Sequence, residues 1–124
     1  MPTPIIITLG DVSLSAELND SSTAQQVIAQ LPIEALANRW GDEFYFAIPV
    51  DHALEADARD EMAVGELAYW PPGNAFCIFF GPTPVSIGSE PRAANPCNPL
   101  GHILDDIDLL LGAGDGVQIQ IDRA

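Results

Sequence analysis

Short runs in which apolar and polar residues alternate, separated by glycine and proline, recur along almost the whole chain. In residues 12–18, for example, apolar side chains occupy every second position, which places them on one face of an extended strand. Seven or eight runs of this kind predict a mainly β fold. Because free sheet edges promote aggregation, we expect this sheet to close into a barrel.

The most buried strand and the main loops can also be located. Residues 76–80 are apolar at every position, which is typical of a central strand covered on both faces. Residues 51–66 are rich in acidic side chains and predict a polar loop. Residues 81–99 contain five prolines, so we expect them to form a long surface loop of the kind that often carries function.

Two segments favour helices. Residues 22–31 begin with Ser22 and Gln25, the two positions of a capping box, and end at Pro32. Residues 105–111 predict a second, shorter helix with acidic side chains near its positively polarised N-terminus. The apolar stripe of the first helix, which should cover the sheet, consists of Ala24, Val27, Ile28 and Leu31.

The length and the charge balance restrict the organisation and the partners. A chain of 124 residues fits one domain, which we place at residues 1–124. It carries 18 acidic and 4 basic residues, the latter all arginine, for a formal net charge of −14. Such a surface repels phosphates, so we expect binding neither to nucleic acid nor to anionic membranes. The sequence does not indicate an oligomeric state.

The N-terminus and the cysteines predict the compartment. The first residues lack the basic segment of a signal peptide, and no apolar run approaches the length of a membrane span. We therefore expect a cytoplasmic protein. Cys77 lies in an apolar run and Cys97 lies between prolines in the expected loop, and both thiols should be free in a reducing compartment.

The sequence contains no motif for a metal, a cofactor or covalent catalysis. A phosphate-binding P-loop, a paired Cys-x-x-Cys and a nucleophile elbow are all missing. The glycines of residues 112–116 precede a strand rather than a helix, and we interpret them as a turn. Asp105, Asp106 and Asp108 lack the glycine and the later glutamate of a calcium loop. We therefore predict no metal site and no cofactor.

Three stretches resemble a known family. They are Asn-Arg-Trp-Gly-Asp-Glu-Phe-Tyr-Phe at residues 38–46, Val-Gly-Glu-Leu-Ala-Tyr-Trp-Pro-Pro-Gly at residues 64–73, and Asn-Pro-Leu-Gly at residues 98–101. In order and spacing the chain resembles the small stand-alone cyclophilin-like domains of bacteria and archaea. The resemblance implies a closed eight-stranded barrel with two short helices, one at each end. That family has no assigned reaction, and a fold alone does not settle a function.

The motifs of prolyl isomerases are absent. Cyclophilins with that activity carry a Phe-His-Arg stretch and a Phe-Met-Gln-Gly-Gly stretch around the proline pocket, and neither occurs here. Arg39 precedes Trp40 and cannot be matched to the catalytic arginine by motif. We therefore expect little or no isomerase activity, and whether the chain is an enzyme is left open.

All nine aromatic residues fall between residues 40 and 80. Strand alternation places about half of them in the core, and an entirely buried set is an open alternative. In the other interpretation, several of them line a pocket, and a few polar groups at turns and strand ends orient a ligand. The predicted ligand-binding residues are Asn38, Trp40, Glu43, Tyr45, Trp70, Thr83 and Asn98.

These observations favour a binding module for a small molecule or a short peptide. Two alternatives remain. The first is a structural or assembly domain, because the same barrel resembles parts of oxoprolinase-type and allophanate-hydrolase-type subunits. The second is a prolyl isomerase with an atypical site.

Overall fold

Nine strands, one α-helix and two 3-10 helices make up the computed structural model, which describes residues 2–124. No helix in this part of the chain is long and apolar enough to cross a membrane. In chain order the elements are β1 (Thr3–Leu9), β2 (Val12–Leu18), α1 (Ser22–Ala29), β3 (Ile33–Arg39), β4 (Glu43–Ala47), β5 (Arg59–Glu61), β6 (Glu66–Trp70), η1 (Pro71–Gly73), β7 (Ala75–Phe79), β8 (Arg92–Ile103), η2 (Ile107–Leu110) and β9 (Val117–Arg123).

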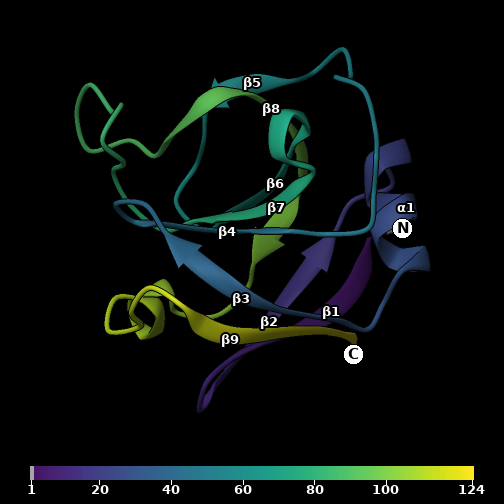
Figure 1. Ribbon diagram of the computed structural model, residues 1–124, viewed down its shortest axis with the longest axis horizontal. Helices are drawn as coiled ribbons and strands as arrows, with labels where there is room; N and C mark the ends of the chain where they lie inside the picture. Colours follow the sequence, from purple (N-terminus) through teal and green to yellow (C-terminus); the bar gives the residue numbers. More distant parts are fainter. Residues whose placement is uncertain (1) are drawn as a thin grey trace.

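Eight of these strands form a closed antiparallel ring (Figure 1). The order around the ring is β2-β1-β9-β3-β4-β7-β6-β8, and pairing of β8 with β2 closes it, with Leu18 opposite Gly101. The predicted mainly β fold with eight strands in a closed sheet is confirmed. Strand β5 lies outside the ring and, among the strands of residues 2–124, pairs only with β8.

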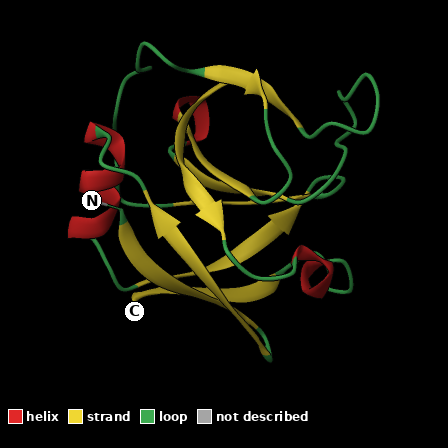
Figure 2. Cartoon of the chain, turned by 180° about the vertical axis from the view of Figure 1, so that it is seen from behind, coloured by secondary structure: helices red, strands yellow, loops and turns green. Residues whose placement is uncertain are grey.

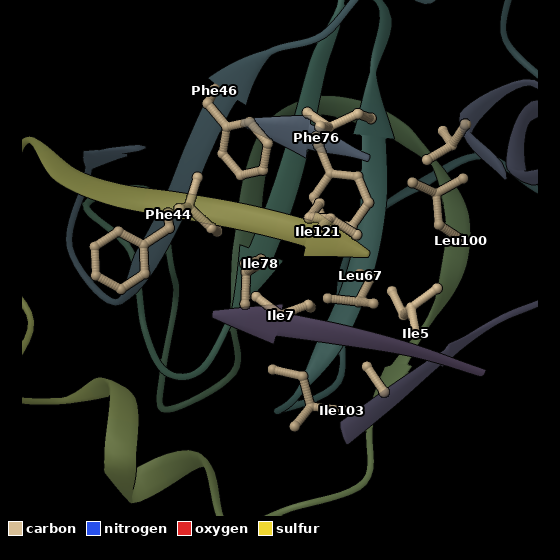
Figure 3. Packing of buried hydrophobic residues seen from close by; sticks show 14 of the residues in the cluster. Ile5, Ile7, Phe44, Phe46, Leu67, Phe76, Ile78, Leu100, Ile103 and Ile121 are labelled. Carbon is tan, nitrogen blue, oxygen red and sulfur yellow. The ribbon is translucent and has the colours of Figure 1, made fainter. Parts of the chain in front are cut away.

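The inside of the ring is filled by the apolar side chains that strand alternation selects. On β2, for example, Leu14, Ala16 and Leu18 are fully buried, as the period of two predicts. Phe46 and Phe76 stack within this core, with ring centroids 5.4 Å apart (Figure 3). This interior core stabilises the ring on which the outer elements are built.

The helices differ from the prediction in detail. The side chain of Ser21, rather than that of Ser22, caps α1, where it accepts a hydrogen bond of 3.1 Å from the backbone N–H of Ala24. The apolar stripe of α1 packs against the interior core as expected. The second predicted helix, residues 105–111, is shorter: it is the 3-10 turn η2, which the Asp106 side chain caps.

The prediction of a loop over residues 81–99 is wrong in its second half, because β8 begins at Arg92. The prolines fit this strand because they lie where a sheet tolerates them. Pro96 is exposed, and Pro99 lies at a bulge where the register with β6 shifts between Leu67 and Ala68. Strands β3 and β5 were not predicted, because alanine, asparagine and charged residues give weak strand signals.

Strand β8 belongs to two layers. Its second half pairs with β6 in the ring, whereas its first half pairs with β5 and covers the outer face of the sheet (Figures 1 and 2). Strand β7, buried at every position, is therefore covered on both sides, as its apolar sequence predicts. The second apolar cluster lies between the two layers and contains Met62, Ala68, Ala75, Cys77, Phe79, Ala93 and Cys97, with Tyr45 and Trp70 at its margin.

Candidate functional site

A pocket of about 130 Å³ opens at the margin of this second cluster. Its floor and walls come from the turn before β4, from β4 and β6 of the ring, and from the first half of β8 in the outer layer. The lining residues are Trp40, Glu43, Tyr45, Trp70, Ala93, Ala94 and Cys97.

Strand alternation directs the β4 side chains into this pocket. Phe44 and Phe46 point into the ring, so Glu43 and Tyr45 point outward to the pocket. Trp40 is held beside them by a turn in which the backbone N–H of Trp40 donates to the carbonyl of Glu43 at 2.9 Å. The turn after β3 and the first residues of β4 therefore place one carboxyl group and two aromatic rings together.

Trp70, at the end of β6, forms the wall that adjoins Tyr45. Its ring meets that of Tyr45 edge-on, at 6.4 Å between centroids and 75° between planes. The indole N–H donates to the side chain of Asn95 at 3.1 Å, which joins the end of β6 to β8. A Cβ at Gly73 would lie 2.6 Å from the indole ring, so only glycine lets η1 pass this close to Trp70.

The carboxyl group of Glu43 is the most unusual group in the pocket. The residue is only 5% exposed, and among residues 2–124 its Oε1 is the one buried side-chain nitrogen or oxygen atom with no hydrogen-bond partner. Burial raises the pKa of Glu43 to about 7, and a hydrogen bond with the Cys77 thiol lowers it in part. Near neutral pH this group can therefore act both as a proton donor and as an acceptor.

Cys77 and Cys97, both buried and free, lie beside this carboxyl group. Burial raises the pKa of the Cys77 thiol well above its ordinary value, and its contacts with Cys97 and Glu43 raise it further. The Cys77 thiol therefore stays protonated at neutral pH and is a poor nucleophile. Cys97 lies in β8 and not in a loop, which corrects its predicted position.

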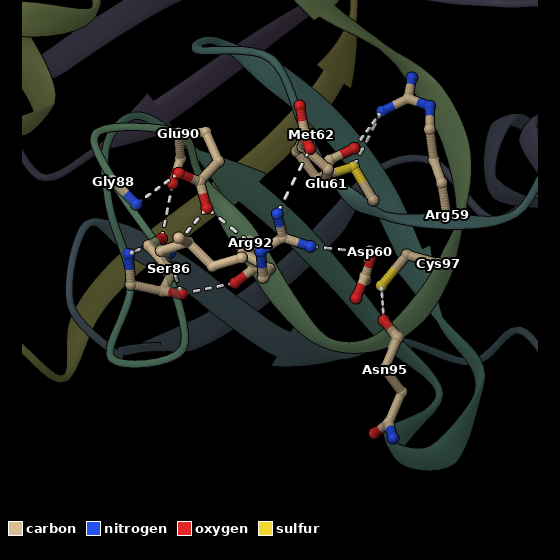
Figure 4. Close-up of polar contacts among 12 residues, drawn as sticks. Arg59, Asp60, Glu61, Met62, Ser86, Gly88, Glu90, Arg92, Asn95 and Cys97 are labelled. Carbon is tan, nitrogen blue, oxygen red and sulfur yellow. Dashed lines mark hydrogen bonds and ion pairs between the residues drawn. The ribbon is translucent and has the colours of Figure 1, made fainter.

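Arg92 fastens the outer layer that forms one side of the pocket (Figure 4). Its guanidinium contacts Glu90 at 3.1 Å, and Asp60 and Glu61 each at 3.3 Å. Hydrogen bonds from the backbone N–H groups of Ile87 and Gly88 lower the pKa of Glu90 to about 2, and the bond from Ile87 contributes most. Strand β8 is thus held to β5 and to the preceding loop next to Ala93.

The pocket brings together four of the seven predicted site residues: Trp40, Glu43, Tyr45 and Trp70. All three of these aromatic rings are partly exposed, whereas the other six aromatic residues are buried. The alternative of an entirely buried aromatic set therefore does not describe this structure.

The other three predicted residues do not line the pocket and instead support the surrounding structure. Asn38 is exposed and donates to the carbonyl of Tyr45 at 3.4 Å. The Thr83 hydroxyl donates to the carbonyl of Arg92. Asn98 is fully buried. Its side-chain NH₂ group donates to the carbonyl of Ala53 at 2.9 Å and to the hydroxyl of Thr23, and its side-chain oxygen accepts from the backbone N–H of Glu55.

Sequence reasoning missed Ala93, Ala94 and Cys97 as pocket residues. Alanine carries no chemical signal, and their position depends on β8 folding over the sheet. A second hollow of about 340 Å³ includes Arg59 and Glu66, but these side chains are paired with each other. Among residues 2–124, no group of three or more histidine, cysteine or acidic side chains is arranged to hold a metal.

Arg39 lies outside the pocket and is fully engaged. Its guanidinium lies over the ring of Phe80, 5.0 Å from the centroid, and pairs with Asp42 at 2.9 Å. Its remaining hydrogen bonds are to the backbone carbonyls of Gly41, Leu111 and Ala113.

The comparisons with known proteins agree with this architecture. The family model described as cyclophilin-like matches residues 3–122. A hypothetical protein from Archaeoglobus fulgidus, solved in solution, is 35% identical and superposes with a TM-score of 0.84, covering 99% of this chain and 95% of that chain. No curated protein matches the chain. Since the family model spans nearly the whole sequence, the chain belongs to the cyclophilin-like family.

Proposed function

We propose that the chain is a binding module whose ligand occupies the pocket between β4, β6 and β8. The observation that carries this proposal is that Glu43 lines the pocket and that its buried Oε1 has no hydrogen-bond partner among residues 2–124. Buried polar atoms in folded proteins are nearly always hydrogen-bonded, and leaving one unpaired lowers stability. A ligand that donates a hydrogen bond to Glu43 would remove this cost.

The volume of the pocket limits the size of the ligand. Pockets for drug-sized molecules occupy roughly 300–1,000 Å³, whereas this pocket has about 130 Å³. A cavity of about 150 Å³ is enough to hold benzene. The pocket therefore suits a compound of about that size, or a single side chain of a peptide.

The proposal can be tested with the chain's own reporters. Trp40 and Trp70 are its two tryptophans, and both line the pocket. A library of small cationic, neutral and anionic compounds should contain ligands that shift both indole N–H resonances in an NMR spectrum. Tyr45→Ala should weaken their binding at least about tenfold, because it removes one aromatic wall.

Leu36→Ala is the matched control, since it also removes a large side chain but one that is exposed on β3. This variant should bind every ligand as the unmodified protein does. If no compound shifts either indole resonance, or if Tyr45→Ala binds normally, the pocket is not a ligand site.

A further inference from the structure

We propose that the ligand presents an organic cation, a guanidinium or an alkylammonium group, to Glu43 between the rings of Trp40, Tyr45 and Trp70. This inference rests on the proposed function and specifies the chemistry of the same pocket. Both possible sources, a free small molecule and an arginine or lysine side chain of a peptide, share this group.

The carboxyl group of Glu43 has no positively charged partner in the described part of the pocket. Among the described residues that line the pocket, none carries a positive charge. The other titratable groups beside Glu43 are Tyr45 on the same strand, Cys77 on β7 and Cys97 on β8, and none of these becomes cationic. The ionised form of a buried carboxyl group is stabilised by a counter-charge, and no described side chain that lines the pocket supplies one, so a cationic ligand is the partner that fits it.

The walls of the pocket are largely aromatic. Tyr45 and Trp70 meet at 75° and form an aromatic corner, and Trp40 adds a third ring to the lining. The faces of such rings attract cations, most strongly when the site is shielded from water. An acidic group together with several aromatic rings is therefore better matched to an organic cation than to an anion or a purely apolar ligand.

The electrostatic field of the whole chain also favours a cationic ligand. The formal net charge is −14. Three of the four arginines are already paired: Arg39 with Asp42, Arg59 with Glu66, and Arg92 with three carboxylates. The uncompensated acidic charge raises the local concentration of cations and repels anions. The field therefore favours the same class of ligand as the pocket does.

The experiment compares cations with neutral molecules of the same shape. Methylguanidinium is titrated against methylurea, and n-butylammonium against n-butanol, at pH 8 and low salt, with the indole resonances of Trp40 and Trp70 as the readout. Each cation should bind at least about tenfold more tightly than its neutral counterpart. Lowering the pH from 8 to 5 should weaken cation binding by roughly 100-fold, because Glu43 becomes protonated.

Glu43→Gln keeps the shape of the side chain and should reduce the preference for cations at least about tenfold, to what the aromatic rings and the net charge supply. Glu34→Gln, which changes the net charge equally at an exposed position of β3, should retain it. Short blocked peptides with one arginine or one lysine distinguish the two sources of the cation. If the natural ligand is a peptide, these peptides should bind at least as tightly as the free cations. If it is a small molecule, the free cations should bind more tightly than the peptides.

Neutral molecules that bind as well as the cations, or a cation preference that is undiminished in Glu43→Gln, would overturn this inference while leaving the pocket as a binding site. If the cations, their neutral counterparts and the compound library all leave both indole resonances unchanged, the proposed function fails as well.

Discussion

Replacing Gly101 with alanine is expected to destabilise the fold by roughly 4 kcal/mol, because no room exists for a side chain where β8 closes the ring. A Cβ built on Gly101 would lie 1.9 Å from the carbonyl oxygen of Glu17, and the backbone φ is +152°, which side chains rarely adopt. The obstructing oxygen belongs to the backbone, so it cannot move aside by a side-chain rotation. Gly101 lies opposite Leu18 in the pairing of β8 with β2, so the substitution separates the two strands that close the ring.

Gly112→Ala is the matched control, because among residues 2–124 no atom beyond its two chain neighbours lies within 4 Å of the added Cβ. This variant should differ from the unmodified protein by less than about 0.5 kcal/mol in urea unfolding. Failure of Gly101→Ala to accumulate as soluble protein, while Gly112→Ala accumulates normally, would be a stronger form of the same result. A Gly101→Ala protein within about 1 kcal/mol of the original would show that the ring closes in another way.

Glu43→Gln is expected to stabilise the protein above neutral pH. The pKa of Glu43 is about 7 in the folded chain against an ordinary 4.5, so the folded state binds the proton more tightly than the unfolded state does. This contribution to stability is fully present below pH 4.5 and is lost as the pH rises through 7. Glutamine does not ionise, so the variant should be more stable at pH 8 by about 2–3 kcal/mol.

Urea unfolding of the two proteins at pH 4 and at pH 8 provides the measurement. The difference between them should be small at pH 4 and should grow to its full size by pH 8. Glu34→Gln, at an exposed position, should follow the unmodified protein at both pH values. Equal pH dependence in Glu43→Gln and the unmodified protein would mean that Glu43 is not held in a desolvated state.

Most of the ring could be predicted because its signals are local. The alternation in β2 and the uniformly apolar β7 each determine which side chains are buried, whatever their neighbours are. The start of β8 could not be predicted, because proline normally argues against a strand. Only the bulge at Pro99 and the exposed position of Pro96 make the sequence compatible with pairing.

The pocket could be predicted only in part, because some of its residues are brought together by contacts between distant parts of the chain. Trp40, Glu43, Tyr45 and Trp70 are distinctive residues at turns or on the outer face of a strand, and their chemistry suggested a site. The burial of Glu43 depends on contacts between segments far apart in the chain. Strand β8 supplies Ala93 and Cys97 from positions more than forty residues away from Glu43, and the position of its first half depends on pairing with β5 and on the ion pairs of Arg92.

The most direct test of the ligand site is a crystallographic soak with a set of small fragments that includes organic cations. We expect fragment density between Trp40, Tyr45 and Trp70, with a donor within hydrogen-bond distance of the carboxyl group of Glu43. Fragments that bind only elsewhere on the surface, with this pocket empty or closed by its own side chains, would contradict it.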